Sequence, residues 1–243
     1  MKPIYEQVFS ITQNMSDRYG RAKPSALLYL IQQAAGEHCK LLAVDANVLA
    51  PKHLFWAVTR CRVQITRLPR VDEQVRITTW PMPTTKVAYP RSVVAYDENG
   101  QELFRSISLW VLMDANTRTM ILPGRSDITV EGALTGAELA VPHAIAARSM
   151  ENSVMRQVGF SLLDQNGHMN NTRSMDWVED LLPSAFHESH PVREFTLCYL
   201  NEALEGDQIS LGYTLSEEMV LTVDARQNVC PEGTRVFAAQ VQF

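Results

Sequence analysis

The sequence predicts an α+β protein built from two tandem units, in each of which an antiparallel sheet wraps around a central helix. Three observations lead to this prediction. The same order of elements occurs twice, each copy places one helical stretch ahead of several alternating strands, and a stretch without periodicity separates the copies. At 243 residues, of which 46% are hydrophobic, the chain is long enough for two small cores that each bury a sheet against a helix.

The first unit is expected at residues 1–123. Residues 8–14 are strand-like, residues 17–20 have the composition of a turn, and the apolar residues of 24–43 recur at helical spacing. Alternation and β-branched residues then predict strands at 54–67, 75–80, 93–96 and 102–113, the last two joined by the hairpin sequence Asp97-Glu98-Asn99-Gly100.

The second unit is expected at residues 151–243, after a linker at 124–150 that is rich in Ala, Gly and Ser. A strand at 157–163, a turn at 164–167 and a helix that starts at Asn171 and that Pro183 closes repeat the order of the first unit. The remaining strands are predicted at 193–200, 208–215, 219–225 and 236–243.

Short matches in the same order favour an internal duplication. Tyr5-Glu6-Gln7-Val8 resembles Met155-Arg156-Gln157-Val158. Val63-x-Ile65 followed by Glu73-Gln74-Val75 resembles Leu197-x-Tyr199 followed by Asp207-Gln208-Ile209. Under this alignment the turn of residues 17–21 corresponds to the turn that begins at Asp164, and Leu68 corresponds to Glu202.

Composition narrows the classes of partner. The net charge of -5 argues against nucleic acid as the main partner, because phosphate binding needs a basic surface. The first residues lack the order of a signal peptide, and no apolar stretch approaches ~18 to 20 residues, so we expect a cytoplasmic protein without a membrane segment. The cysteines are scattered and form no C-x-x-C pair, which argues against a disulfide framework and a metal site: Cys39, Cys61, Cys198 and Cys230.

The densest polar cluster lies where a strand is expected to give way to the second helix. Asp164, Asn166 and His168 alternate there, and Asn170 and Asn171 precede the predicted helix. Unpaired backbone N–H groups at such a helix start can stabilise an oxyanion, while the side chains can orient, hydrogen-bond and transfer protons. Turn formation and helix capping are the alternative explanation of the same residues.

The duplication favours chemistry over turn formation. The corresponding turn of the first unit, Asp17-Arg18-Tyr19-Gly20-Arg21, closes without the asparagine or the histidine. Glu202 likewise stands where the first unit has the apolar Leu68, and a carboxylate at a sheet position is costly unless it is exposed, paired or functional. Simple exposure to solvent remains the alternative for Glu202.

The stretch Asp164-Gln165-Asn166-Gly167-His168-Met169-Asn170-Asn171 resembles the D-x-N-x-H-x-N-N signature of plant and bacterial acyl-ACP thioesterases. Leu197-Cys198-Tyr199-Leu200-Asn201-Glu202 is similar to their second active-site strand, and segments of the first unit, such as Ser108-x-Trp110-x-x-Met113-Asp114, are similar to their first domain. The resemblance covers nearly the whole chain and implies two hotdog units. It also implies a catalytic set at four positions: Asp164, Asn166, His168 and Glu202.

One departure from the family bears on the mechanism. Plant members often have a cysteine directly after the glutamate, whereas this chain has Ala203. We therefore expect water, activated by Glu202 and His168, to attack the thioester of a fatty acyl-ACP without a metal or organic cofactor. An acyl-CoA thioesterase or a β-hydroxyacyl dehydratase of the same fold and a non-enzymatic acyl-ACP-binding protein are the alternatives, and a homodimer is left open.

Two further surfaces are expected in the first unit. The fatty acyl chain is predicted to lie between the sheet and the helix of residues 24–43, where Ala34 and Gly36 would limit its length. The acyl carrier protein is predicted to dock on a cluster of basic residues whose alternative explanation is a solvated sheet face: Arg60, Arg62, Arg67, Arg70 and Arg76.

Overall fold

The computed structural model describes residues 3–227 and 233–243. The chain divides into two compact units, Met1–Pro142 and His143–Phe243. The division falls inside the stretch 124–150, which contains only the short helical turn η3 (Pro123–Arg125) at its start and no strand. Each unit is an antiparallel sheet with helices, so the predicted α+β class is confirmed.

The first unit contains a sheet of five long strands and one long helix in the described part. Its strands are β1 (Tyr5–Ser10), β2 (Leu54–Ile65), β3 (Gln74–Pro81), β4 (Tyr89–Tyr96) and β5 (Glu102–Asp114), to which the short β6 (Met120–Ile121) is added. They pair in the order β1-β3-β4-β5-β2. Short helical segments lie between the strands: η1 (Gln13–Met15), α2 (Ala46–Leu49) and η2 (Ala50–Lys52).

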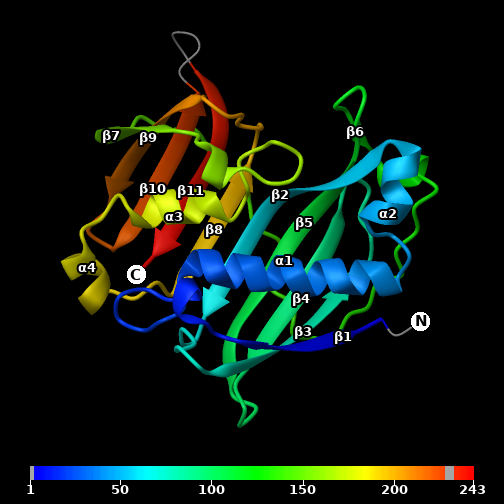
Figure 1. Cartoon of the computed structure of the whole chain (residues 1–243), viewed down its shortest axis with the longest axis horizontal. Coiled ribbons are helices and arrows are strands. Elements are labelled where there is room, and N and C mark those ends of the chain that lie inside the picture. Colours follow the sequence, from blue (N-terminus) through cyan, green and yellow to red (C-terminus); the bar gives the residue numbers. More distant parts are fainter. Residues whose placement is uncertain (1–2, 228–232) are drawn as a thin grey trace. The chain divides into compact units, whose positions relative to one another are not determined.

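Helix α1 (Pro24–Leu41) lies across one face of this sheet (Figure 1). Proline at its first position is compatible with helix geometry, because the missing N–H has no intrahelical partner there. The helix buries one apolar side, including Leu27, Leu30 and Ala34, each of which is 0% exposed. Burial of this side against the sheet forms the core that the helical spacing predicted.

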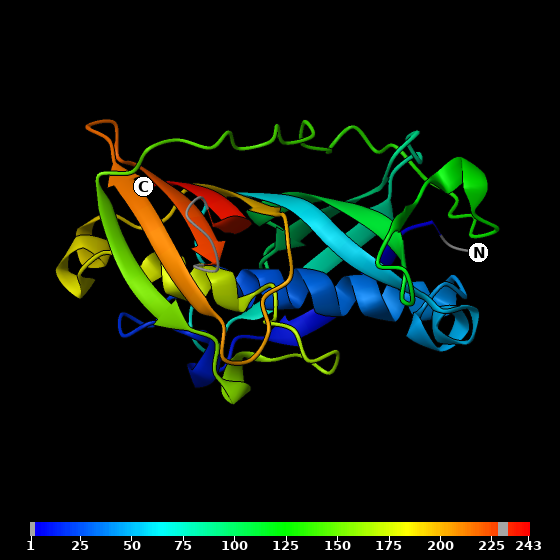
Figure 2. The same cartoon turned by 90° about the horizontal axis from the view of Figure 1, so that it is seen from above.

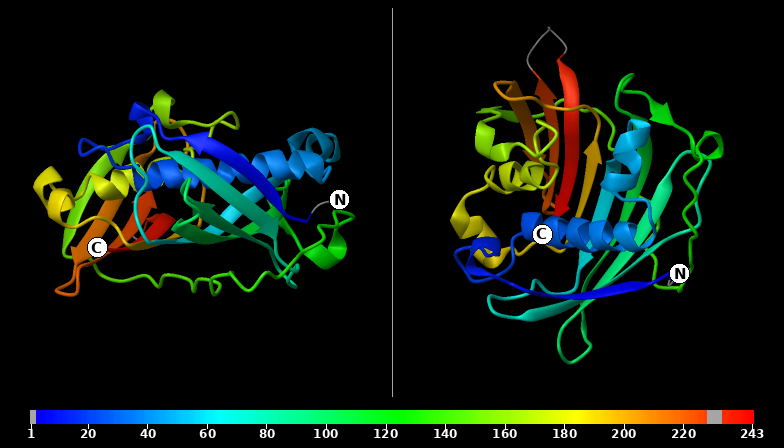
Figure 3. Two further views of the ribbon diagram at one scale, coloured as in Figure 1. Left: turned by 90° about the horizontal axis from the view of Figure 1, so that it is seen from below. Right: turned by 45° about the vertical axis from the view of Figure 1, so that its right-hand side comes forward.

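The second unit repeats the same arrangement. Its strands are β7 (Asn152–Gln157), β8 (Glu194–Tyr199), β9 (Gln208–Leu215), β10 (Val220–Gln227) and β11 (Thr234–Gln242), paired in the order β7-β9-β10-β11-β8. Its helices are η4 (Phe160–Leu162), α3 (Arg173–Glu179) and α4 (Ser184–Ser189). Figure 3 shows α3 beside the strands of this unit. Met175 and Val178 of α3, both 0% exposed, enter its core.

Four predicted boundaries are wrong. The first strand of each unit lies earlier than predicted, at β1 and β7, because a short 3-10 turn (η1 or η4) replaces the end of the expected strand. Helix α3 starts at Arg173 rather than at Asn171, because the Asn170 side chain holds the backbone of Thr172 in a separate turn. It ends at Glu179, and Pro183 precedes the new helix α4 instead of closing α3.

Equivalent backbone hydrogen bonds occur in the two units, and they correct one predicted match. The Ile11 N–H donates to the Glu73 carbonyl at 3.0 Å, and the Val158 N–H donates to the Asp207 carbonyl at the same distance. Ile11 is therefore the counterpart of Val158, so the match between Tyr5-Glu6-Gln7-Val8 and Met155-Arg156-Gln157-Val158 is wrong by three residues. The match of Glu73 with Asp207 is confirmed.

The expected alternation along residues 54–67 is interrupted by a bulge. Val58 pairs with Trp110, and Arg60 pairs with the preceding residue, Leu109, so Thr59 is the extra residue. After the bulge Arg60 and Arg62 share one face of the sheet, as predicted. Val58 and Cys61 consequently share the other face.

The stretch of residues 124–150 contains no strand, but hydrogen bonds attach part of it to the sheet of the first unit. In the first unit, Figure 2 shows this segment on the side of the sheet away from α1. Trp80 Nε1 donates to Glu138 Oε1 at 3.0 Å, and the Ala133 N–H donates to the Pro81 carbonyl at 2.9 Å. Burial would raise the pKa of Glu138, but hydrogen bonds from Thr135 and Trp80 outweigh it and lower the pKa to about 2.

In the described residues no helix is long and apolar enough to cross a membrane.

Candidate active site

The polar cluster of the second unit is a closed turn between η4 and α3. The Asp164 N–H donates to the His168 carbonyl at 2.8 Å, and the Gly167 N–H donates to the Asp164 carbonyl at 3.0 Å. Gly167 has φ +78°, a conformation that favours glycine. The turn therefore fixes the backbone from which Asn166 and His168 project.

The Asp164 carboxylate organises this turn. Its Oδ1 accepts the N–H groups of Asn166 at 2.8 Å and of His168 at 3.3 Å, while its Oδ2 accepts Asn166 Nδ2 at 3.4 Å. Asp164 thus bonds to the backbone of both neighbouring site residues and to the side chain of one. These hydrogen bonds hold the backbone of the turn around Asp164.

The turn is attached to the segment that follows β8. The Met169 N–H donates to the Ala203 carbonyl at 2.8 Å, and His168 and Leu204 form an isolated antiparallel bridge. These backbone contacts bring together residues that are more than thirty positions apart in the sequence. His168 and Glu202 are therefore held on two segments that are themselves bonded together.

His168 and Glu202 are in contact in the candidate site. His168 Nε2 lies 3.5 Å from Glu202 Oε2, with 20% of the histidine side chain and 45% of the glutamate side chain exposed. Glu202 is thus partly exposed to solvent and also paired with His168. Exposure and pairing, which the sequence left as alternatives for this carboxylate, therefore both apply. A carboxylate beside an imidazole can orient the ring and share a proton with it, which is the arrangement of a general base.

The first unit contains the same turn with different side chains. The Asp17 N–H donates to the Arg21 carbonyl at 2.7 Å, and Asp17 Oδ1 accepts the N–H groups of Tyr19 and Arg21 at 2.8 and 2.9 Å. The Ala22 N–H donates to the Pro69 carbonyl, as the Met169 N–H does to the Ala203 carbonyl. Arg21 therefore occupies the position of His168, and the buried Leu68 that of Glu202.

The two asparagines that follow the turn differ in what they can offer. The Asn170 N–H donates to the Leu162 carbonyl at 2.8 Å, so the expectation that this amide stabilises an oxyanion is wrong in this structure. Within the described residues no acceptor pairs with the Asn171 N–H. Of the two amides, the one at Asn171 is the candidate donor.

Tyr199 is a site residue that the sequence reasoning did not identify. Its hydroxyl donates to the Asn171 carbonyl at 3.0 Å, and Ser174 Oγ donates to the same carbonyl at 2.6 Å. The two hydroxyls fix the orientation of the Asn171 residue. The signal was present in the duplication, because Tyr199 matches the apolar Ile65 of the first unit.

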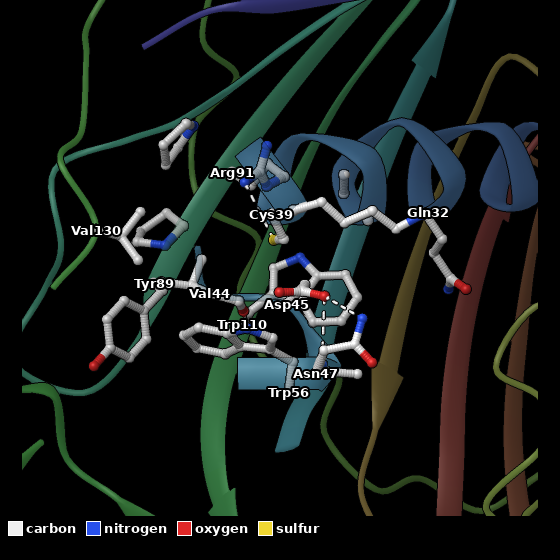
Figure 4. A pocket seen from close by; sticks show the side chains of 16 residues that line it. Gln32, Cys39, Val44, Asp45, Asn47, Trp56, Tyr89, Arg91, Trp110 and Val130 are labelled. Carbon is white, nitrogen blue, oxygen red and sulfur yellow. Dashed lines mark hydrogen bonds between the residues drawn. The ribbon is translucent and has the colours of Figure 1, made fainter. Parts of the chain in front are cut away.

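The first unit contains a cavity of about 320 Å³ between α1, α2 and strands β2 to β5. Its walls are mostly apolar, with Trp56, Tyr89 and Trp110 from three of the strands (Figure 4). Gly36 lines the cavity, and a Cβ atom added to it would meet no atom within 4 Å. Ala34 is 0% exposed and does not line this cavity, so the structure separates the two residues that were expected to act together.

The five arginines of the expected docking surface have different environments. Arg67 binds both carboxylate oxygens of Glu73, at 2.9 and 2.6 Å, and Arg76 binds Glu6 at 3.2 Å. Arg60 donates to the Pro142 carbonyl at 3.2 Å. In the described part of the chain no carboxylate pairs with the exposed Arg70 guanidinium. The backbone N–H of Arg70 donates to Glu73 Oε2 at 2.9 Å, and the charge of Arg70 helps to lower the pKa of Glu73. The cluster is therefore partly neutralised, and Arg70 is an exposed member of it.

The described cysteines are free thiols: Cys39, Cys61 and Cys198. Burial raises the pKa of Cys61 to about 12, and burial also raises the pKa of Cys39. Both groups therefore stay protonated at neutral pH. Cys230 lies outside the described residues. Among the residues that are described, no three His, Cys, Asp or Glu side chains gather as a metal site would require.

The chain is similar to known thioesterases in both sequence and fold. It is 27% identical over 217 residues to the palmitoyl-acyl carrier protein thioesterase, chloroplastic, of Gossypium hirsutum, which covers 82% of this chain and 52% of that protein. It is 27% identical over 198 residues to the dodecanoyl-[acyl-carrier-protein] hydrolase, chloroplastic, of Umbellularia californica, covering 73% and 50%. The chain thus spans about half the length of the curated relatives that it matches.

Two solved structures share the whole fold. An acyl-ACP thioesterase from Bacteroides thetaiotaomicron superposes with a TM-score of 0.86 at 21% identity and covers 99% of this chain and 98% of its own. The 12:0-ACP thioesterase from Umbellularia californica superposes with a TM-score of 0.83 at 21% identity, covering 100% and 97%. The two tandem hotdog units are confirmed by these likenesses.

Family models match almost every residue. Residues 2–123 match the acyl-ACP thioesterase N-terminal domain, and residues 146–243 match the acyl-ACP thioesterase C-terminal domain. The chain therefore belongs to the acyl-ACP thioesterase family.

Proposed function

We propose that this protein hydrolyses the thioester of fatty acyl-ACP and releases a free fatty acid and the carrier protein. The observation that supports this most directly is the contact of 3.5 Å between His168 Nε2 and Glu202 Oε2 in the second unit. The corresponding positions of the first unit hold Arg21 and Leu68 on the same backbone. The pair is therefore an addition to a turn that closes without it.

In the proposed reaction, water adds its oxygen to the thioester carbonyl carbon. Glu202 and His168 accept the proton that the water loses, a form of catalysis worth about 10²–10⁴ in rate. Asn166, beside His168 on the turn, binds the water or the thioester. Asp164 keeps Asn166 and His168 in place through the three hydrogen bonds described above.

The carbonyl oxygen becomes an oxyanion when the water adds. The Asn171 N–H is the proposed donor to it, and one such donor contributes on the order of 10²–10³ in rate. When the tetrahedral intermediate collapses, the carbon–sulfur bond breaks, and the proton held by the base returns to the leaving thiolate. The products are a carboxylic acid and a free thiol on the carrier.

The reaction needs no cysteine nucleophile in this proposal. Ala203 follows Glu202 directly, and this residue is 3% exposed. The buried Cys198 lies in a small cluster with Ile145 and Ala238. Its packing supports a structural role.

The first unit is proposed to hold the fatty acyl chain in the cavity that Gly36 lines. The carrier protein is proposed to dock on the arginine cluster, of which Arg70 is an exposed member. A role in fatty acid biosynthesis and a cytoplasmic location stay predictions.

The decisive experiment measures the release of free thiol from unsubstituted acyl-ACP of several chain lengths by the purified full chain. We expect thiol and free fatty acid to appear in equal amounts. Binding without turnover would favour an acyl-ACP-binding protein, and turnover of acyl-CoA in preference to acyl-ACP would favour the second kind of thioesterase. Release of water from 3-hydroxyacyl-ACP without free thiol would indicate a dehydratase.

A further inference from the structure

Arg91 is an unusual residue in the wall of the cavity of the first unit. It comes from β4, is 6% exposed, and lines a space whose other walls are mostly apolar (Figure 4). A buried cation is costly unless an anion or several good acceptors compensate for its lost hydration. The partners of Arg91 therefore decide whether the structure needs this charge for its own stability.

The partners of Arg91 are an imidazole nitrogen, a hydroxyl and a thiol. Its Nη1 lies 3.1 Å from His38 Nδ1 and 3.2 Å from Thr79 Oγ1, and its Nη2 lies 3.8 Å from Cys39 Sγ. In the described residues no carboxylate bonds to the guanidinium. Burial lowers the pKa of Arg91 and raises that of the Cys39 thiol, so the cysteine does not supply the missing anion. The guanidinium still has N–H groups that none of these contacts uses.

The other charged residues that line the cavity are already paired. Lys40 Nζ lies 2.7 Å from Glu37 Oε1. The Asp45 carboxylate accepts the N–H and Nδ2 of Asn47 at 3.3 and 3.0 Å. Lys40 and Asp45 thus bond to neighbours on their own segments, whereas in the described part no carboxylate, that of Asp45 included, bonds to the Arg91 guanidinium.

We infer that this cavity takes an acyl chain that carries an acceptor oxygen, a hydroxyl or a carboxylate away from the thioester, and that Arg91 selects such a chain over a plain hydrocarbon one. The inference rests on the proposed function and names its substrate class. An oxygen on the acyl chain would accept hydrogen bonds from the unused N–H groups of Arg91. An unsubstituted acyl chain would exclude water from these groups and leave them without acceptors. A binding site discriminates against a substrate analogue that lacks an acceptor, because the analogue leaves buried donors of the site without a hydrogen bond.

The test compares kcat/KM for acyl-ACP substrates of one chain length. One is unsubstituted, a series moves a hydroxyl group along the chain one carbon at a time, and one ends in a carboxylate. We expect the native chain to favour at least one oxygenated substrate over the unsubstituted one by about 10- to 100-fold, the range for a hydrogen bond to a charged group. An unsubstituted substrate that is hydrolysed as well as every oxygenated one would overturn the inference.

Variants assign the preference to Arg91. Arg91→Met keeps the length of the side chain and removes its donors, so the ratio of oxygenated to unsubstituted kcat/KM should fall to about one or below. Arg193→Met, which removes an exposed arginine of the second unit that does not line the cavity, should keep the native ratio. An unchanged ratio in Arg91→Met of native thermal stability would contradict the inference. If this variant does not fold, the substrate ratio of the native chain decides alone.

The two proposals fail in different ways. If no acyl-ACP of either kind releases thiol, the proposed hydrolase function is wrong. If unsubstituted acyl-ACP is hydrolysed efficiently and the oxygenated substrates are not, the hydrolase function stands and the role of Arg91 is wrong.

Discussion

The turns at Asp17 and Asp164 have the same backbone and different side chains. In both, an aspartate accepts two following N–H groups and a glycine closes the turn with positive φ, +73° at Gly20 and +78° at Gly167. The first turn adds Arg21, which pairs with Asp17 at 3.0 Å and stacks on Tyr19. The second adds His168 beside Glu202. Comparison of the two separates what the fold needs from what the chemistry needs.

The two units also differ in the length of their main helix. Helix α1 has 18 residues, whereas α3 has 7. The longer helix, with α2 beside it, provides one side of the cavity that Gly36 lines. Each copy of the fold thus has its own candidate task, the first for the acyl chain and the second for the thioester.

The largest effect is expected when the added pair is removed. Glu202→Ala and His168→Ala should each lower kcat by about 10²–10⁴, because the general base is lost. Thermal unfolding and circular dichroism should stay near native, since Leu68 and Arg21 show that the turn closes with other residues. Arg21→Ala is the matched control, which should keep kcat. Near-native turnover by either variant of the pair would contradict the mechanism.

Replacement of each aspartate by alanine tests the comparison of the two turns further. Asp17→Ala and Asp164→Ala should each destabilise the protein by about 1–2 kcal/mol, because each aspartate satisfies two backbone N–H groups. Only Asp164→Ala should also lower kcat, since only that turn positions Asn166 and His168. The measurements are chemical denaturation and steady-state kinetics. Equal losses of kcat in both variants would remove the distinction between the two turns.

A smaller effect is expected at the docking surface. Arg70→Glu should raise KM for acyl-ACP on the order of tenfold at low salt and less at high salt, because a carrier with an acidic surface would be repelled. Hydrolysis of a small acyl-pantetheine should change little. Arg193→Glu, the same charge change on the second unit, is the control. Equal effects on the two substrates would show that Arg70 supports the fold or the site instead.

Gly36 and Ala34 should respond differently to enlargement. Gly36→Val should shift the preference toward shorter acyl chains, because the added atoms enter open space in the cavity. Ala34→Val should instead lower stability by about 1–3 kcal/mol, because it overpacks the core without reaching the cavity. Hydrolysis rates across a series of acyl-ACP lengths test this. An unchanged profile in folded Gly36→Val would place the acyl chain elsewhere.

The smallest effect is expected from the cysteines. Replacement of Cys39, Cys61, Cys198 and Cys230 by Ala or Ser should leave kcat within a few-fold, because the proposed catalytic groups include no thiol. Some loss of stability is expected at the buried Cys61, where the change removes packed atoms. If thiol-blocking reagents abolish activity without unfolding the protein, a cysteine nucleophile must be reconsidered.

The sequence by itself determined the two units, the order of their strands along the chain and the correspondence of His168 with Arg21. These features depend on local periodicity and on turn residues, which a linear sequence records directly. The same patterns placed the first strand of each unit too late and began the second helix two residues early. Side-chain hydrogen bonds, such as those of Asn170 with Thr172, redirect the backbone there in a way that composition does not reveal.

Only the tertiary structure decided which side chains meet. In it the Asn170 N–H bonds to the Leu162 carbonyl, and the Tyr199 hydroxyl bonds to the Asn171 carbonyl. Gly36 lines the cavity of the first unit and Ala34 does not. It also pairs Arg67 with Glu73, and among the residues that the structure describes it brings no carboxylate into a bond with the buried Arg91. These outcomes depend on strand pairing and on the packing of α1 against the sheet, which bring together residues distant in the sequence. Their energies come from burial and hydrogen bonding in three dimensions, so no local pattern of residues could encode them.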